Sequence, residues 1–167
     1  MTNVLAIDLG NVIIDHKSFG TTPEYVLSGD YRAIPEVPDS ISVISQLAHG
    51  PFHSRVHVMY NASTVANEKI QEWLRHHEFS SRTGISSEKI HRSEHGRDKS
   101  ALCLCHNVTH FIDDRLEVLG MLVKTVNNLF LLNAHEEEVS AFRRHLPYVI
   151  KLSTWLEIER ALNKSAQ

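Results

Sequence analysis

The chain has 167 residues, of which 42% are hydrophobic and 22% charged, a composition typical of a globular domain with a substantial core. Its 17 basic and 20 acidic residues give a formal net charge of −3, which argues against broad, nonspecific nucleic-acid binding. No apolar run approaches the length of a membrane span, and the N-terminus does not resemble a secretory signal. We therefore expect a cytoplasmic protein with neither a membrane nor a nucleic acid as its partner.

The predicted elements alternate between strand and helix. Residues 4–7 form a continuous apolar run that fits a strand buried on both faces, and residues 12–14 continue the extended character. Residues 16–36 contain two glycines and two prolines, so an irregular excursion is expected there. Helices are then expected at 38–50, 65–77, 99–105, 116–123 and 139–146, and after a capping-box spacing at Thr154 and Glu157. Further strands are expected at 55–60, 109–112, 129–132 and 149–152, with a short one around Ile90 in the polar stretch 78–98.

This alternation predicts an α/β fold with a doubly wound, mainly parallel central sheet and helices on both faces. No repeat, low-complexity tract or linker divides the chain, so residues 1–167 are expected to form a single domain. Ligands of such sheets bind beyond the carboxyl ends of the strands. The residues that follow the predicted strands are therefore the first candidates for a functional site.

Two of the predicted strands end in aspartate. Asp8 follows the first strand, and Asp113 and Asp114 follow the strand at residues 109–112. If these strands are neighbours, three carboxylates converge in one crevice and repel one another unless a cation neutralises them. An oxygen-only ligand set favours Mg²⁺. The alternative is that each aspartate only caps the turn or helix after it, but the coincidence of both strands favours a metal site.

Four stretches of the chain resemble, in order and in strand context, the motifs of the haloacid dehalogenase superfamily, whose members are mostly phosphatases. They are residues 6–12, 56–63, 97–100 and 111–114, which read AIDLGNV, VHVMYNAS, RDKS and FIDD. The resemblance spans nearly the whole chain and implies the Rossmann-like fold of that superfamily. Its first and fourth motifs are specific when taken together, whereas the second and third are weak singly.

The resemblance also implies roles for individual residues. Asp8 would be the catalytic nucleophile that forms an aspartyl-phosphate, with Lys99 as the second catalytic residue, neutralising nucleophile and phosphate. Mg²⁺ would be held by Asp8, the main-chain carbonyl of Gly10, and the Asp113 and Asp114 pair. A phosphorylated substrate would be bound by the side chains of Lys99, Asn11, Asn61 and Ser63. For Lys99 the alternative is a solvated charge, and for Asn61 a turn residue, and the sequence leaves both open.

The chain departs from the family motifs at two positions. Gly10 stands where the phosphatases usually have a second aspartate, which protonates the leaving group and later activates water. Asp15 or His16, just beyond the turn, could take over that role. Tyr60 lies where a serine or threonine is expected. No gap between the motifs is long enough for a sizeable cap domain, so the site is expected to be open unless a protein partner or a second subunit covers it.

Three functions are compatible with these residues. The leading hypothesis is a Mg²⁺-dependent phosphoester hydrolase that acts through Asp8, on a small-molecule or macromolecular substrate. The second is a catalytically weak or inactive relative that binds a phosphorylated ligand or a protein partner, as Gly10 and Tyr60 suggest. The third is a haloacid dehalogenase, which would use Asp8 without Mg²⁺.

The 12 histidines include three pairs with i, i+4 spacing, but none of them lies wholly within a predicted helix. A zinc site built from Cys103, Cys105, His106 and His110 is conceivable, but i, i+2 residues on a helix do not face each other. We therefore interpret the histidines as surface or packing residues. The two cysteines also make a poor disulfide pair, which favours a reduced, intracellular protein.

Overall fold

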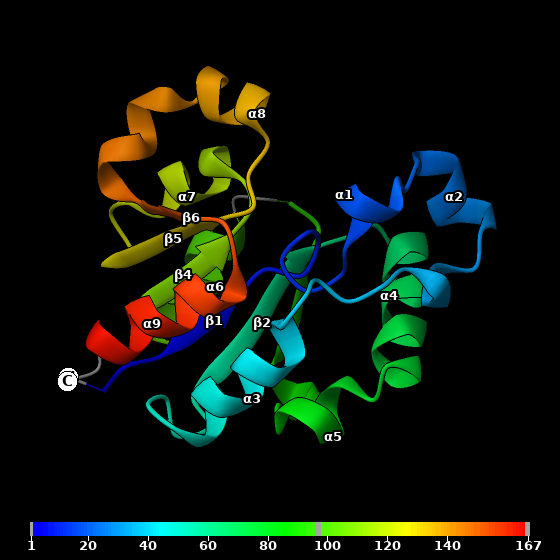
Figure 1. Ribbon diagram of the computed structural model, residues 1–167, viewed down its shortest axis with the longest axis horizontal. Coiled ribbons are helices and arrows are strands. Elements are labelled where there is room, and N and C mark those ends of the chain that lie inside the picture. Colours follow the sequence, from blue (N-terminus) through cyan, green and yellow to red (C-terminus); the bar gives the residue numbers. More distant parts are fainter. Residues whose placement is uncertain (1, 96–97, 166–167) are drawn as a thin grey trace.

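A computed structural model describes residues 2–95 and 98–165. It contains a six-stranded sheet with the order β3-β2-β1-β4-β5-β6, in which every neighbouring pair of strands is parallel (Figure 1). The strands are β1 Leu5–Ile7, β2 Val56–Asn61, β3 Ile90–Ser93, β4 His110–Asp113, β5 Asn128–Leu132 and β6 Ile150–Leu152. The predicted α/β class with a parallel central sheet is confirmed.

Helices connect the strands and cover both faces of the sheet (Figure 1). The α-helices are α1 His16–Phe19, α2 Pro23–Ser28, α3 Ser40–His49, α4 Thr64–His76, α5 Phe79–Thr83, α6 Asp98–Cys105, α7 Leu116–Leu122, α8 Glu136–Ala141 and α9 Trp155–Ser165. Three 3₁₀ helices are η1 Tyr31–Ala33, η2 Ser87–Lys89 and η3 Arg143–Tyr148.

The core has two layers, one on each face of the sheet. Along β1, Leu5 and Ile7 belong to the layer that α3 and α9 cover, whereas Ala6 belongs to the layer that α6 and α7 cover. This alternation follows from the two-residue repeat of a strand, and it requires an apolar residue at every position. It explains why the first strand reads as an uninterrupted apolar run.

The excursion at residues 16–36 is more regular than predicted. It contains α1, α2 and η1, and the Asp15 and Thr22 side chains accept hydrogen bonds from the backbone N–H groups of the first turns of α1 and α2. Pro23 lies in the first turn of α2, where its missing N–H costs nothing. The indole of Trp73 on α4 donates to the Ile34 carbonyl at 2.8 Å and anchors the end of the excursion. Glycine and proline therefore mark the boundaries of short helices here, not an irregular loop.

The turn after β1 also differs from the prediction, because residues 12–14 do not extend the strand. The backbone N–H groups of Ile13 and Ile14 both donate to the Leu9 carbonyl, at 2.9 and 3.0 Å, which closes a compact turn. The buried indole of Trp155 on α9 donates to the Val12 carbonyl at 2.7 Å. A residue far along the chain thus holds the turn that follows the strand of Asp8.

Two further predictions concern the C-terminal third. The helix expected at residues 139–146 is split, because α8 ends at Ala141 and η3, which contains Pro147, follows it. The predicted capping box is confirmed: the Glu157 side chain accepts from the Thr154 N–H, and the Glu157 N–H donates to the Thr154 hydroxyl, each at 3.3 Å. Glu157 and Thr154 therefore fix the start of α9.

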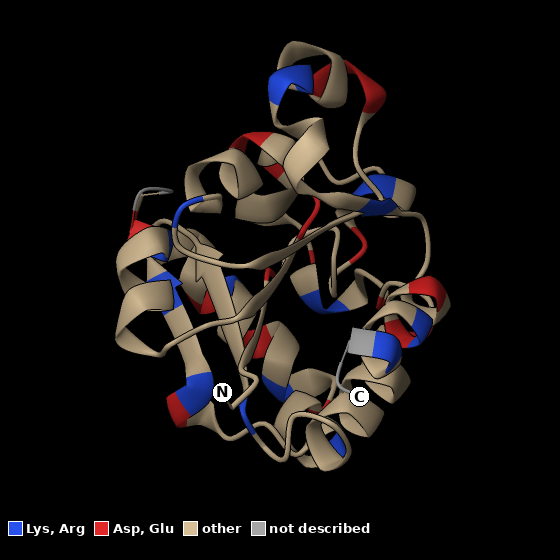
Figure 2. Ribbon diagram, turned by 90° about the vertical axis from the view of Figure 1, so that its left-hand side faces the viewer, with Lys and Arg blue, Asp and Glu red and all other residues tan. Residues whose placement is uncertain are grey.

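Charged residues of both signs are interspersed over the elements in the view of Figure 2. This mixture of signs is in keeping with the small net charge of −3. Within the described ranges, every helix is too short or too polar to cross a bilayer.

Candidate active site

The acidic residues lie where the strand order reverses direction. From β1 the chain builds the sheet outward through β2 and β3, and then returns to place β4 on the other side of β1. Asp8 directly follows β1, Asp113 ends β4 and Asp114 comes next. The Asp8 N–H donates to the Ile112 carbonyl at 2.9 Å, which joins the two strand ends. In open α/β sheets a crevice forms at this reversal, beyond the carboxyl ends of the strands.

Lys99 joins the two strand ends through its side chain. It lies in the first turn of α6, and its ammonium nitrogen is 2.5 Å from Asp8 Oδ1 and 2.8 Å from Asp113 Oδ2. The lysine side chain is only 3% exposed, so the alternative of a solvated charge is excluded. Arg97, the first residue of the same motif, lies outside the described residues.

The three carboxylates each offer an oxygen, and these oxygens lie within 4.8 Å of one another. With all three ionised, one ammonium leaves two negative charges uncompensated. Burial, together with the Asp113 and Asp8 charges, raises the pKa of Asp114 to about 8. Burial also raises the pKa of Asp8 to about 6, against the attraction of Lys99. Burial opposes the charge on Lys99, but attraction to Asp113 and Asp8 outweighs it and raises the pKa of the ammonium.

This donor set fits a divalent cation with a preference for oxygen. Three carboxylates that crowd together strongly enough to raise two of their pKa values are stabilised by added positive charge. Their oxygens, in a set without sulfur or nitrogen, match the preference of Mg²⁺. Asp113 is held in place for this role, since its second oxygen accepts from the Arg115 N–H at 3.0 Å.

Asn11 supports Asp114 from the turn after β1. Its side-chain Nδ2 donates to Asp114 Oδ2 at 3.1 Å, and its side-chain Oδ1 accepts from the Lys17 N–H at 2.9 Å. The backbone of Asn11 has a φ of 56°, a left-handed conformation that asparagine tolerates better than most residues. The family resemblance implied a phosphate contact for Asn11. The structure shows in addition that the Asn11 side chain is hydrogen-bonded to Asp114.

His16 occupies the space beside Gly10. A Cβ atom built on Gly10 would lie 3.6 Å from Cδ2 and 4.0 Å from Nε2 of the imidazole, which is ordinary van der Waals contact. The imidazole Nε2 is 3.0 Å from the Tyr31 hydroxyl, and burial lowers the pKa of His16. Asp15, the other residue suggested as an acid, accepts from the Ser18 N–H and caps α1. No residue pattern predicted the contact between His16 and Tyr31.

The second motif lies at the end of β2. The Asn61 side chain accepts a short hydrogen bond from the Ser93 hydroxyl, and the Ser63 hydroxyl caps α4 by accepting from the Ala66 N–H at 3.3 Å. The Tyr60 hydroxyl donates to Asn67 at 2.6 Å and accepts from Gln71 on α4. The Tyr60 hydroxyl is therefore engaged in hydrogen bonds with two side chains of α4. Both Asn61 and Ser63 are exposed at the edge where β1 and β4 end.

A shallow pocket of about 690 Å³ is lined by the chain neighbours of Lys99 and Asp114, namely Asp98 and Arg115. Its lining includes Asn61 at the end of β2, Asp98 at the start of α6, and Arg115 after the acidic pair. The pocket thus collects residues of the second and third motifs and the residue that follows the fourth. Arg115 places a cationic side chain on its wall, together with the carboxylates of Glu94, Asp98 and Glu117.

The fold is that of haloacid-dehalogenase-like hydrolases. Neither a protein-family model nor a curated protein sequence matches the chain. Among solved structures, D,D-heptose 1.7-bisphosphate phosphatase from B. bronchiseptica, complexed with magnesium and phosphate, has a TM-score of 0.67 at 14% identity, over 98% of this chain and 99% of its own.

Two further solved structures show the same fold. A putative haloacid dehalogenase-like hydrolase from Burkholderia xenovorans LB400 has a TM-score of 0.66 at 11% identity, over 95% of this chain and 97% of its own. A HAD family hydrolase from Deinococcus radiodurans R1, with bound phosphate and sodium, has a TM-score of 0.67 at 12% identity, over 97% of this chain and 95% of its own. At these identities the likeness establishes the fold.

The raised pKa values predict that Mg²⁺ binding depends on pH. Without metal, Asp114 is mostly protonated below about pH 8 and Asp8 below about pH 6, so an ion that needs both carboxylates must displace protons. We expect Mg²⁺ affinity, measured by calorimetric titration, to rise about tenfold per pH unit from 6 to 8, since one proton is released there. Asp114→Asn should flatten this slope. A wild-type affinity that does not change with pH would contradict the assignment of the site.

Proposed function

We propose that this chain is a Mg²⁺-dependent phosphoester hydrolase of the haloacid dehalogenase superfamily, with Asp8 as its nucleophile. One observation carries the proposal: the buried Lys99 ammonium joins Asp8 to Asp113, and Asp114 completes a group of three carboxylates at the reversal point of the sheet. The fold shared with structures solved with phosphate supports it. The sequence motifs supplied the same residues independently.

The first chemical step would take place at the Asp8 carboxylate. One of its oxygens attacks phosphorus and forms an aspartyl-phosphate, while the bond from phosphorus to the ester oxygen breaks. Lys99 holds the attacking carboxylate and offsets the charge of the phosphoryl group. Water then attacks phosphorus, which releases inorganic phosphate and regenerates Asp8.

Mg²⁺ would be held by Asp8, Asp113, Asp114 and the main-chain carbonyl of Gly10. When bound, the ion supplies the positive charge that offsets the developing negative charge on the phosphoryl oxygens. Two neighbouring groups orient the carboxylates: the Asn11 side-chain amide donates to Asp114, and the Arg115 N–H donates to Asp113. Asn11, Asn61, Ser63 and Lys99 are the groups proposed to contact the phosphoryl oxygens.

His16 is proposed as the proton donor that replaces the aspartate missing at Gly10. Its imidazole lies next to the position that a side chain at residue 10 would occupy, and the Tyr31 hydroxyl holds it there. In the first step the imidazolium, which burial makes the minor form of His16 at neutral pH, would give its proton to the departing ester oxygen. In the second step the neutral imidazole would take a proton from the attacking water.

This role predicts the effect of His16→Ala. We expect turnover of an alkyl phosphate to fall about 10²–10⁴-fold, the usual contribution of a general acid. An aryl phosphate should lose far less, because its leaving group departs without a proton. A Cβ atom at residue 10 would meet only ordinary van der Waals contacts. Adding Gly10→Asp, whose protonated carboxyl group can donate the proton, should therefore restore activity on the alkyl phosphate. Equal losses on both substrates, or no rescue, would remove His16 from the mechanism.

The substrate is proposed to be a phosphorylated small molecule or macromolecule. Residues 1–167 would form one domain with no sizeable cap, so the shallow pocket lined by Asp98 and Arg115 would stay open to a large substrate. A protein partner or a second subunit could cover it. We also propose that the protein is cytoplasmic.

The assay that tests the function is hydrolysis of p-nitrophenyl phosphate with Mg²⁺ and with EDTA. We expect turnover only with Mg²⁺. If turnover is absent while calorimetry still detects phosphate binding, the chain is instead a phosphate-binding relative without activity, a function that the engaged Tyr60 hydroxyl favours. Halide release from a haloacid without metal would instead support a dehalogenase.

A further inference from the structure

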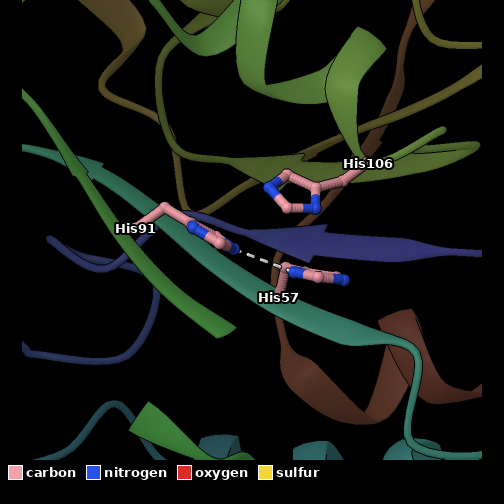
Figure 3. A group of neighbouring side chains, drawn as sticks. All are labelled: His57, His91 and His106. Atoms are coloured by element: carbon pink, nitrogen blue, oxygen red, sulfur yellow. Dashed lines mark hydrogen bonds between the residues drawn. The ribbon is translucent and has the colours of Figure 1, made fainter. Parts of the chain in front are cut away.

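Three imidazole rings meet on the face of the sheet that α6 covers. They belong to His57 on β2, His91 on the edge strand β3, and His106, which directly follows α6 (Figure 3). The Nδ1 atom of His57 is 2.9 Å from Nε2 of His91. The centroid of the His106 ring lies 4.7 Å from that of His57 and 4.4 Å from that of His91. One nitrogen of each ring falls in a group whose members are all within 4.8 Å of one another.

This histidine cluster (His57, His91 and His106) is separate from the candidate active site. His57 precedes Asn61 by four residues of β2, about 13 Å along an extended strand. His106 follows Lys99 by seven residues along α6, which corresponds to about 10 Å of helix rise. The cluster therefore lies toward the amino ends of the strands, and the carboxylates lie beyond their carboxyl ends. It serves none of the steps proposed above.

Two of the rings, His57 and His91, are favoured as neutral ligands. Burial, with smaller effects from His106, His91 and Lys89, lowers the pKa of His57 to about 4, and burial together with His106 lowers the pKa of His91. No carboxylate belongs to the cluster in the described part of the chain. The ammonium of Lys89, the nearby cation, is bound to the Ser54 carbonyl at 2.6 Å. All three histidines are partly exposed, which leaves a path for an ion from solvent.

We propose that His57, His91 and His106 bind a Zn²⁺ ion. Neutral imidazole nitrogens suit Zn²⁺ and neighbouring first-row metals and do not suit Mg²⁺. Tetrahedral Zn²⁺ with bonds of about 2.0–2.1 Å places two nitrogen ligands about 3.3 Å apart. The 2.9 Å contact between His57 and His91 is close to this separation, so small side-chain rotations exchange that hydrogen bond for two bonds to the ion. Water would fill the fourth position, because no other histidine, cysteine, aspartate or glutamate joins the group among residues 2–95 and 98–165.

The ion would tie together β2, β3 and α6, which are separate elements along the chain. The edge strand β3 pairs with β2 alone, and α6 carries Lys99 at its opposite end. A bond from each element to one ion would fix β3 and α6 against β2. A ligand that binds only the folded state also stabilises it against unfolding. The site would therefore be structural, and its loss should lower the thermal stability of the zinc-loaded protein.

The test uses the full chain, with thiols reduced and excess Mg²⁺ present to occupy the carboxylate site. We expect calorimetry to show one Zn²⁺ bound per chain and Tm to rise with Zn²⁺. Co²⁺ should give the visible spectrum of a tetrahedral nitrogen site, without a thiolate charge-transfer band, since Cys103 and Cys105 lie outside the cluster. His106→Gln should weaken Zn²⁺ binding at least about 100-fold, because losing even an outer partner of a ligand costs about 10–100-fold.

His91→Gln serves as a second variant on another element, and His135→Gln, at an exposed histidine that precedes α8, is the matched control. Both cluster variants should lose binding and the Zn²⁺-dependent rise in Tm, while the control retains them. Circular dichroism without metal checks that the variants fold. The proposal is overturned if wild type binds no Zn²⁺ beyond nonspecific levels, or if folded His91→Gln and His106→Gln both bind it as tightly as wild type. In that case the three rings are only a stacked, hydrogen-bonded packing cluster.

Discussion

The Asp8→Asn substitution is expected to lower phosphoester hydrolysis by about 10⁴-fold or more, since removal of a nucleophile removes the covalent route altogether. The amide has the shape of the carboxylate, and its oxygen can still accept from Lys99, so the fold should persist. One negative charge also disappears from a group in which repulsion and burial raise pKa values. We therefore expect thermal stability without Mg²⁺ to stay equal or to rise. Steady-state kinetics and a melting curve measure the two effects.

Asp30→Asn provides the matched control for this substitution. Asp30 pairs with Arg32 on the surface, where the side chains are 54% and 53% exposed, and an ion pair of this kind contributes little to stability. Its removal should leave turnover unchanged. If Asp8→Asn retains turnover within tenfold of the wild type, another residue is the nucleophile.

Lys99→Met is expected to destabilise the metal-free protein by about 3–5 kcal/mol at high pH, because it leaves Asp8 and Asp113 as buried charges without their cation. The loss should shrink as the pH falls toward 6, since the Asp8 carboxyl group can then take up a proton, and also when Mg²⁺ is added. Turnover should fall sharply as well, because the phosphoryl group loses its neutralising contact. Urea unfolding at several pH values, with and without Mg²⁺, measures the stability change.

Lys124→Met, at an exposed lysine after α7, controls for the loss of a surface charge. Substitution of such a surface residue should change the free energy of unfolding by less than about 0.5 kcal/mol. A Lys99→Met protein that is as stable as the Lys124→Met protein at every pH would show that the lysine bridge makes no net contribution to the folded state.

The fold class and the acidic site could be predicted because their signals are local. An apolar run that ends in aspartate marks a buried parallel strand together with the point where it leaves the sheet, and the chain shows this twice, at Asp8 and at Asp113. The neighbour relation of β1 and β4 was needed to bring these residues together, and it followed only from the family resemblance. The structure contains that pairing.

The residues around the acidic pair could not be predicted, because their contacts depend on backbone geometry. The left-handed φ of Asn11 turns its amide toward Asp114, and no residue pattern specifies that direction. Likewise, the position of His16 beside Gly10 depends on the compact turn at residues 12–14, where an extended segment was expected. Tyr31, which holds His16, lies in an excursion for which little regular structure was expected.

The histidines show the same limit. In sequence, His53 and His57, His91 and His95, and His106 and His110 are four residues apart, and the structure brings His57, His91 and His106 into a single cluster. The conceivable zinc tetrad with Cys103 and His110 does not form, because Cys103 is buried in the core and the His110 ring packs edge-on against Phe52. The register of β2 with β3, in which Met59 lies opposite His91, brings the His57 and His91 rings together, and the end of α6 adds His106.

A crystal structure of the protein grown with Mg²⁺ and phosphate would test the central claim most directly. We predict one ion bonded at about 2.0–2.1 Å to an oxygen of Asp8 and to at least one of Asp113 and Asp114, with the phosphate between that ion and the Lys99 ammonium. Asp8 turned away from the acidic pair, with no ion bridging the ends of β1 and β4, would contradict it.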